Sequence, residues 1–291
     1  MDPKRIFTPL RYPGGKGKFA PYIADLMCRN DLAYGHYLEP YAGGAAVALD
    51  LLFNGIAKHV HINDYDPAIY DFWVSVTKHP DEILKLLHDT PVNIDEWYRW
   101  RFVLNNRDNH TLIERGFATL FINRTNRSGI LKAGVIGGKA QTGNYKLDSR
   151  FKKDVLSDRI KKIAENSSGI SIYNEDALTL LRRAKKLLPT KSLIYLDPPY
   201  YLKGQGLYRN YYEHEDHENI AALIQSPSFN RHWVLSYDNT KEIKQMYRLS
   251  KTFAYNLNYS AQTNYVGSEV MFFSEGLIAK RSNLPNINKA A

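Results

Sequence analysis

The chain has 291 residues, of which 44% are hydrophobic and 24% are charged, as in an ordinary globular protein of one large or two modest domains. Its apolar runs fall short of the ~20 residues that cross a bilayer, so no membrane association is expected. Residues 1–10 lack the continuous apolar core of a secretory signal. The single cysteine, Cys28, excludes a disulfide framework within one chain and a cysteine-based zinc site, and the simplest compartment is a reducing cytoplasm.

The positive charge of the chain is concentrated in one stretch. The formal net charge is +9, and residues 124–162 hold 11 Lys and Arg against 3 Asp and Glu, a surplus of 8. Such a concentration favours a polyanionic partner, because neutralising phosphates releases condensed counterions. An isolated charge run is more often a solvated face, so the neighbouring motifs must decide between these interpretations.

Short apolar runs alternate with helical patterns in the first third of the chain. Strands are expected at residues 36–39 and 58–62, and helices at 45–52 and 67–76. This β-turn-α alternation is typical of a parallel sheet.

The pattern changes in the middle of the chain and then returns. Helices are expected at residues 81–87, 95–104 and 156–163, and residues 127–145 are glycine-rich, polar and basic without clear periodicity. Strands are expected again at the following segments: 169–173, 193–196 and 232–236, with a closing hairpin of 270–273 and 277–279.

These patterns predict one α/β domain that is interrupted by a helical, basic insertion. The expected boundaries place the core domain at 1–80 and 165–285 and the insertion at 81–164. Residues 286–291 are expected to form a frayed tail.

Two features of the first third indicate a nucleoside ligand. Glu39-Pro40-Tyr41-Ala42-Gly43-Gly44-Ala45 lies where the first strand turns into a helix, and glycines there let the backbone approach a ligand closely. Asp64 ends the second strand, where an acidic residue can accept hydrogen bonds from ribose hydroxyls. The turn is not G-x-G-x-x-G, so a dinucleotide site is poorly supported.

A second pair of motifs flanks these features. Asp197-Pro198-Pro199-Tyr200 follows an apolar strand and combines a carboxylate, two rigid prolines and an aromatic ring, which together can hold a planar ring that carries an amino group. Arg11-Tyr12-Pro13-Gly14-Gly15-Lys16 is glycine-rich but lacks the G-x-x-x-x-G-K-[ST] spacing of a nucleotide-binding P-loop.

The order of these motifs resembles that of the DNA adenine-N6 methyltransferases of the Dam type, the D12 class. That class carries its target-recognition insertion between the donor-binding and catalytic motifs, where this chain has its basic stretch. Further similar segments extend the resemblance over roughly residues 8 to 280: Phe121 to Gly129, Ser236 to Asn239 and Tyr265 to Val270. The chain differs at Ala45, where many relatives carry a third glycine, and over residues 130–145, which do not match the recognition hairpin of the GATC-specific enzymes.

The resemblance implies a Rossmann-like α/β sheet with a mainly helical target-recognition insertion, S-adenosylmethionine as methyl donor and no metal. It also implies transfer of the methyl group to N6 of an adenine flipped out of duplex DNA. Asp197 and the Pro198 carbonyl would accept the two N6–H bonds, and Tyr200 would stack on the adenine.

The resemblance implies roles for further residues. The residues expected to bind the donor, together with Asp197, are Tyr12, Lys16, Glu39 and Gly43 at the methionine side, Asp64 at the ribose and Asp176 at the adenine. Asp64 and Asp176 could instead cap the helices that follow them. The candidates for DNA contact are Arg124, Arg127, Lys132 and Lys139. Tyr201, Tyr208, Tyr211 and Tyr212 could cover the flipped base or serve as packing.

Other functions remain open from the sequence. They are methylation of cytosine N4 or of RNA adenine, a catalytically silent DNA-binding module, and a small-molecule or protein methyltransferase. The intact Asp197 and Gly43-Gly44 count against a silent module, and the basic insertion counts against the last alternative. Double-stranded DNA is the expected partner, a cognate restriction endonuclease is a further candidate, and the resemblance implies a monomeric bacterial or phage-encoded protein.

Overall fold

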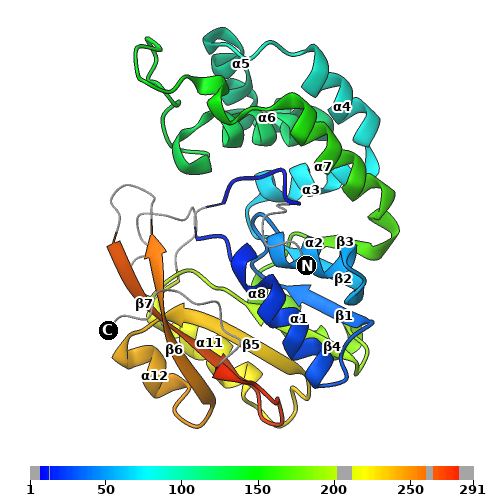
Figure 1. Ribbon diagram of the computed structural model, residues 1–291, viewed down its shortest axis with the longest axis vertical. Helices are drawn as coiled ribbons and strands as arrows, with labels where there is room; N and C mark the ends of the chain where they lie inside the picture. The colour runs from blue at the N-terminus through cyan, green and yellow to red at the C-terminus, as the bar shows by residue number, and fades with distance from the viewer. Residues whose placement is uncertain (1–6, 13, 202–211, 260–264, 282–291) are drawn as a thin grey trace.

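A seven-stranded sheet forms the centre of the molecule (Figure 1). The computed structural model describes residues 7–12, 14–201, 212–259 and 265–281. The strand order is β3-β2-β1-β4-β5-β7-β6, and the strands pair in parallel except β7, which is antiparallel to both neighbours. The strands are β1 (Gly35–Glu39), β2 (Ala57–Asn63), β3 (Ile170–Tyr173), β4 (Ser192–Leu196), β5 (His232–Asp238), β6 (Lys251–Tyr259) and β7 (Tyr265–Phe273).

Helices cover both faces of this sheet, because successive side chains of a strand point to opposite faces. Tyr37 packs into the cluster of one face, and its neighbour Leu38 packs into the cluster of the other. The first face is covered by α1 (Ala20–Arg29), α2 (Ala46–Phe53) and α3 (Pro67–Lys78), and the second by α8 (Ala177–Arg182), α9 (Ala184–Leu187), α11 (His214–Ile224) and α12 (Lys241–Met246).

This topology is the doubly wound, Rossmann-like α/β fold predicted from the sequence. The chain moves outward from β1 through β2 to β3 and then returns to β4 on the other side of β1. The strand order therefore reverses between β1 and β4, and open α/β sheets bind their ligands at the carboxyl ends of the strands at such a point.

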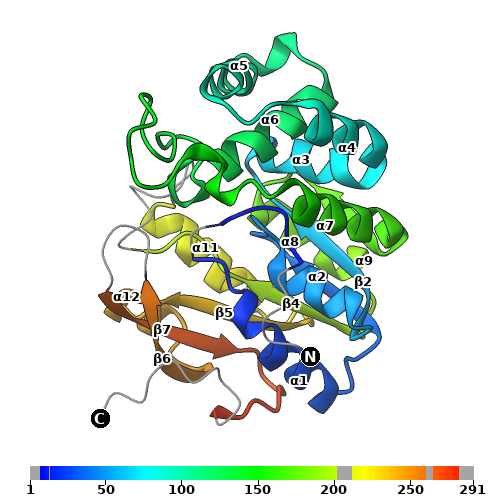
Figure 2. The same ribbon diagram turned by 45° about the horizontal axis from the view of Figure 1, so that its top comes forward.

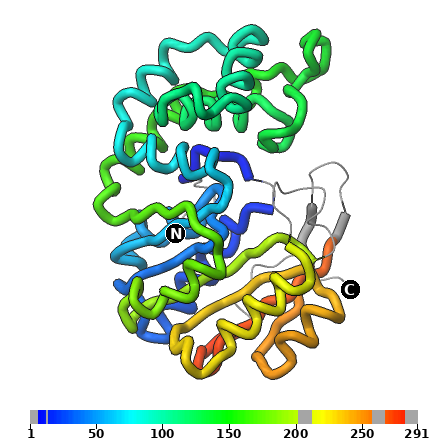
Figure 3. Tube along the Cα trace, turned by 180° about the vertical axis from the view of Figure 1, so that it is seen from behind, coloured from blue at the N-terminus to red at the C-terminus, as the bar shows by residue number. Residues whose placement is uncertain are grey.

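A group of helices stands beyond α3, at the top of the molecule in Figures 1 and 2. They are α4 (Pro80–Asp89), α5 (Ile94–Asn105), α6 (Leu112–Thr125) and α7 (Lys153–Glu165). The segment between α6 and α7 holds the short 3-10 helices η3 (Arg127–Gly129) and η4 (Leu147–Arg150), and the others are η1 (Gly17–Phe19), η2 (Arg107–Asn109) and η5 (Ser167–Gly169). Seen from behind, the group remains set apart from the sheet (Figure 3).

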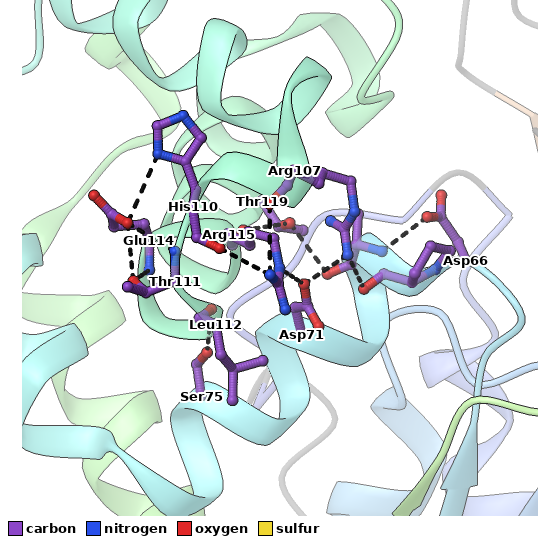
Figure 4. A network of polar contacts seen from close by, with 12 residues as sticks. Asp66, Asp71, Ser75, Arg107, His110, Thr111, Leu112, Glu114, Arg115 and Thr119 are labelled. Atoms are coloured by element: carbon purple, nitrogen blue, oxygen red, sulfur yellow. Dashed lines mark hydrogen bonds and ion pairs between the residues drawn. The ribbon is translucent and has the colours of Figure 1, made fainter.

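A polar network joins this group of helices to α3 (Figure 4). The buried Asp71 carboxylate on α3 accepts hydrogen bonds at 2.6 Å from Arg107 Nη2 and from Arg115 Nε. Gly116 lies against Ser75 so closely that a Cβ there would stand 2.2 Å from Ser75 Oγ. A capping box between Thr111 and Glu114 begins α6 beside this contact.

The C-terminal hairpin corrects one prediction. The expected strand at 277–279 does not form, and β7 pairs instead with β6, from Phe273 opposite Lys251 to Tyr265 opposite Tyr259. β6 and β7 pair over nine residues, whereas the predicted partner strand at 277–279 has only three residues. The signal for β6 was the alternation of Phe253, Tyr255 and Leu257. The other predicted strands and helices correspond to elements of the structure, with ends that differ by up to three residues.

Over the part of the chain that the structure describes, no helix is both long and apolar enough to cross a membrane.

Candidate active site

The carboxyl end of β4 positions the Asp197 carboxylate. All five residues of β4 are buried, and Asp197 follows at the point where the strand leaves the sheet. Asp197 Oδ1 accepts a hydrogen bond from Ser236 Oγ at 2.7 Å and lies 3.1 Å from Lys16 Nζ. Burial raises the pKa of Asp197, and the Lys16 ammonium opposes that rise by stabilising the ionised form.

Glu269 completes this cluster and was not predicted as a site residue. Its carboxylate is fully buried, with Oε1 at 2.8 Å from the Tyr200 hydroxyl and 3.2 Å from Lys16 Nζ. Its Oε2 accepts a hydrogen bond from the Tyr255 hydroxyl at 2.6 Å. A carboxylate inside an apolar strand such as β7 is the sequence signal that could have identified it.

The loop after Asp197 is held in place by hydrogen bonds at both ends. Pro198 is buried, and the Tyr200 ring is only 5% exposed, with its hydroxyl anchored on Glu269. The backbone N–H of Tyr201 donates to Asp238 Oδ1 at the end of β5, at 2.9 Å. The structure thus brings Lys16, which is distant in the sequence, into contact with both Asp197 and Tyr200.

The turn between β1 and α2 forms the second part of the site. Gly43 has a left-handed backbone, with a φ of 46°, and its N–H donates to Asp64 Oδ2 at 2.8 Å. A Cβ on Gly43 would come within 2.8 Å of the Tyr12 ring, so glycine is required for this close approach. Ala45 also has a φ of 46°, a left-handed backbone conformation that favours glycine.

Two carboxyl groups beside this turn have raised pKa values. Asp64 accepts hydrogen bonds from the N–H groups of Gly43 and Asp66, and burial nevertheless raises its pKa to about 7. Glu39 accepts from the Tyr37 hydroxyl at 3.0 Å and from Ala48 N at 3.1 Å, and burial raises its pKa to about 8. At neutral pH Glu39 is therefore largely protonated, and Asp64 is close to its midpoint.

Asp64 and Asp176, the two acidic candidates for contact with the donor, differ in whether they cap a helix. Asp64 does not cap a helix, since Asp66 Oδ1 caps α3 by accepting from Ala68 N at 2.9 Å. Asp176 is exposed and caps α8 through Oδ1, which accepts from Thr179 N at 3.0 Å. Its carboxylate also faces the Thr179 hydroxyl at 3.3 Å, so the capping role accounts for its position.

The four candidates for DNA contact lie in different environments. Arg127, Lys132 and Lys139 are exposed on the segment after α6. Arg124 is partly buried, and its Nε donates to the Arg150 carbonyl at 2.7 Å. Burial lowers the pKa of Arg124 to about 10, and the nearby cations Arg159, Arg11 and Arg150 add to this effect.

Two of the four tyrosines that were singled out after the catalytic loop pack locally. The Tyr201 hydroxyl lies 2.8 Å from His214 Nδ1, and the Tyr212 hydroxyl lies 3.1 Å from that of Tyr41. Tyr208 and Tyr211 fall outside the described residues. The described residues include no group of three or more His, Cys, Asp or Glu side chains that could hold a metal ion.

Residues 12–260 match the family described as D12 class N6 adenine-specific DNA methyltransferase. The chain therefore belongs to this family, and it is an adenine-specific DNA methyltransferase. The match confirms the family and the enzyme class predicted from the sequence.

Individual proteins resemble the chain more distantly. The Type II methyltransferase M.MjaIII of Methanocaldococcus jannaschii is 25% identical over 205 residues, which cover 66% of this chain and 68% of the relative. The putative RNA methyltransferase PH1948 of Pyrococcus horikoshii superposes with a TM-score of 0.43 and 9% identity, over 93% of this chain and 87% of that one. SMU.776, a putative methyltransferase in complex with SAH, gives a TM-score of 0.36 and 10% identity, over 88% and 50% of the two chains.

Proposed function

We propose that the protein transfers a methyl group from S-adenosylmethionine to N6 of an adenine that is flipped out of duplex DNA. The observation that carries this proposal is the position of the Asp197 carboxylate. It lies at the reversal of strand order, next to the turn of Gly43 and Asp64, and it is fixed by Ser236 and Lys16. Family membership supports adenine in DNA as the substrate.

Burial and the Glu269 carboxylate raise the pKa of Asp197, and Lys16 and Ser236 oppose this rise and orient the carboxylate. Lys16 offsets the cost of burial, and Ser236 fixes Oδ1, whereas Oδ2 takes part in neither contact. The carboxylate and the Pro198 carbonyl then accept the two N6–H bonds, so that the N6 lone pair becomes localised and attacks the methyl carbon. S-adenosylmethionine held beside this site would supply the methyl group and keep the electron pair of the broken C–S bond on its sulfur, and the Asp197 carboxylate would take the proton that N6 loses.

The turn after β1 fits the proposed donor. The absence of a Cβ on Gly43 lets the Tyr12 ring lie directly against the turn, and the Asp64 oxygens can accept hydrogen bonds from ribose hydroxyls when ionised. Bound there, S-adenosylmethionine supplies an electrophilic methyl group on a sulfonium. We assign two roles to Lys16: it orients Asp197, and it contacts the methionine side of the donor as the sequence predicted. We assign Glu39 to the support of α2, because its carboxyl group accepts a hydrogen bond from Ala48 N. Asp176 remains the proposed partner of the donor's adenine.

The helical insertion is proposed to hold the DNA. Its exposed cations Arg127, Lys132 and Lys139 can contact phosphates or base edges, and Arg124 supports the segment between α6 and α7. The proposed catalytic domain comprises residues 1–80 and 165–285, and the proposed recognition domain comprises residues 81–164. The same proposal describes the protein as a monomer in the cytoplasm of a bacterium, encoded by the bacterium or by a phage. A cognate restriction endonuclease is its candidate protein partner.

Methyl transfer to duplex DNA from labelled S-adenosylmethionine tests the function. Hydrolysis of the product DNA should yield N6-methyladenine, and Asp197→Asn should lower the rate at least about 100-fold, because the negative charge that stabilises the cation developing at N6 is lost. Donor affinity should change little, since Asp197 is assigned to the adenine of the DNA. Asp25→Asn, at an exposed carboxylate paired with Arg29 on α1, is the matched control and should keep full activity.

Two outcomes would contradict the proposal. A product of N4-methylcytosine would move the substrate to cytosine, and loss of donor binding in Asp197→Asn with a proportionate loss of rate would remove the assigned role of Asp197.

A further inference from the structure

A cavity of about 790 Å³ lies in the insertion, between α5 and the glycine-rich segment that follows α6. Its walls are aromatic on the α5 side, where Trp97, Tyr98 and Phe102 line it, and Gly134 to Lys139 contribute to the opposite wall. A volume between about 300 and 1,000 Å³ with mixed apolar and polar walls is typical of small-molecule and cofactor sites. The proposed mechanism uses none of these residues except the cations at its edge.

The aromatic side of the cavity is exposed to an unusual degree. Tyr98 and Phe102 lie one helical turn apart on α5, and their side chains are 46% and 61% exposed. Trp97 behind them is buried, and its Nε1 donates to Asn126 Oδ1 at 2.8 Å, which fixes the inner wall. Two exposed rings over a rigid wall provide flat apolar surfaces on which another planar ring can stack.

The remaining walls of the cavity are cationic. The Arg101 guanidinium stands 4.9 Å from the centroid of the Trp97 ring and is held by a hydrogen bond to the Ala133 carbonyl at 3.1 Å. Lys139 Nζ lies 5.9 Å from the Tyr98 ring, and Arg127 packs so closely on the glycine-rich segment that a Cβ on Gly134 would stand 2.8 Å from its Nη2. None of the described residues that line the cavity is acidic.

We propose that this cavity is a second nucleobase site, which binds an unpaired DNA base other than the target adenine. Tyr98 and Phe102 stack on the base, and Arg101, Arg127 and Lys139 contact the phosphates that flank it. The combination of stacking rings with a positive groove is the means by which proteins bind single-stranded nucleic acid. The inference rests on the proposed function in one respect, since it takes DNA as the partner of the insertion.

The chemistry of the walls favours this occupant over two others. An acidic peptide would neutralise the cations but would leave two exposed aromatic rings without a planar partner. A base-paired duplex would offer phosphates to the cations, but its base faces are covered by stacking. An unpaired nucleotide presents both a planar face and a phosphate, and base flipping disrupts pairing at the target site.

Binding of a short fluorescein-labelled oligothymidylate, followed by fluorescence anisotropy, tests the proposal. The probe contains no adenine, so it cannot report on the chemical step or on recognition of the target base. The double variant Tyr98→Leu/Phe102→Leu keeps apolar side chains but removes the rings, and it should weaken binding about 5- to 150-fold, the effect expected for the loss of base stacking. The exchange Tyr98→Phe/Phe102→Tyr keeps both rings and should bind as the wild type does.

Controls separate stacking from folding and from the proposed function. Tyr34→Leu changes an exposed tyrosine in the turn before β1 and should leave binding unchanged. A probe with 5-iodouracil should cross-link on irradiation to the peptide that carries Tyr98 and Phe102. Equal affinity of the leucine variant and the wild type, or equal loss in both double variants, would overturn the second base site. Failure of the wild type to methylate duplex DNA would contradict the proposed function alone.

Discussion

Gly43, in the turn between β1 and α2, is constrained in both its backbone conformation and its packing. It combines a left-handed backbone with a Cβ position 2.8 Å from the Tyr12 ring. Gly55 shares the left-handed backbone, with a φ of 68°, but a Cβ there would meet no atom within 4 Å. The two glycines therefore separate the cost of backbone strain from the cost of the close approach.

The variant Gly43→Ala should lose donor affinity by tenfold or more, because its new methyl group displaces the Tyr12 ring from the proposed donor site. Gly55→Ala, the matched control, should lose about 1–2 kcal/mol of unfolding free energy from strain and keep the donor affinity of the wild type. Isothermal titration calorimetry and urea unfolding measure the two effects. Equal donor affinities in the two variants would show that the Gly43 turn does not contact the donor.

The proposed contact of Asp64 with the donor predicts that donor binding depends on pH. Its pKa of about 7 means that the carboxylate is lost as the pH falls below 7, and with it the proposed acceptor for the ribose hydroxyls. Donor affinity should therefore rise between pH 6 and 8 and level off above, and Asp64→Asn should be weaker and lack this rise. Titrations from pH 5.5 to 8.5 measure it. An affinity that falls over this range would contradict the assignment.

The raised pKa values of Asp64 and Glu39 make the stability of the fold decrease as the pH rises, whereas donor affinity is expected to increase. The folded state keeps protons on Asp64 and Glu39 that the unfolded chain releases near pH 4. Above that pH the folded state therefore binds more protons than the unfolded chain does. The stabilisation that these two groups contribute is complete below about pH 4. It is lost as the pH rises through about 7 for Asp64 and about 8 for Glu39.

The residues of the site divide into those that local sequence could predict and those that it could not. Asp197, Gly43 and Asp64 follow strands in recognisable turns, and the structure shows them at the carboxyl ends of β4, β1 and β2. Glu269 and Ser236 become neighbours of Asp197 and Lys16 only through the pairing of β5 with β4 and with β7. Strand order depends on tertiary packing, so no local pattern revealed them.

At the scale of elements, the contact between α3 and α6 fixes the insertion on the sheet domain. α3 begins just after Asp64, and its Asp71 receives both Arg107 and Arg115 (Figure 4). The sequence predicted no helix over α6, whereas α4, α5 and α7 were predictable from their periodicity. The attachment of the insertion to α3 was not predictable, because it depends on a buried ion pair and on Gly116 facing Ser75.

Removing the Asp71 carboxylate should destabilise this contact strongly. Asp71→Ala leaves two guanidinium groups without their shared acceptor, and we expect a loss of about 3–5 kcal/mol in unfolding free energy. Asp25→Ala breaks an exposed pair with Arg29 and should cost less than about 1 kcal/mol. Urea unfolding compares the two variants. Similar small losses in both would mean that the network of Figure 4 contributes little to the attachment.

At the scale of the whole molecule, the positive charge and the proposed catalytic carboxylate of Asp197 belong to different parts of the chain. The surplus of 8 between residues 124 and 162 lies at the end of α6, in the segment that follows it and in α7, whereas Asp197 directly follows a strand of the sheet. The parallel part of the sheet and the position of the helical stretch along the chain were predictable from the β-α alternation of the sequence. The DNA sequence that the proposed recognition domain binds was not predictable, because residues 130–145 lack a regular element of their own.

The charge distribution predicts a difference between two lysines. Lys132→Ala should weaken binding to duplex DNA of any sequence and reduce the salt slope of log K by about 1, because one phosphate contact is lost. Lys241→Ala, at an exposed lysine of α12 outside the insertion, should change neither quantity. Anisotropy titrations between 50 and 200 mM salt, the range over which such contacts are distinguished, provide the comparison. Equal slopes for the two variants would remove Lys132 from the interface.

The most direct test of the central claim is single-molecule sequencing of DNA from a methylation-free host that expresses this chain. The account predicts N6-methyladenine at a short recurring motif, and its absence when the host expresses Asp197→Asn. Folded protein that binds S-adenosylmethionine but leaves every adenine in that DNA unmodified would contradict it.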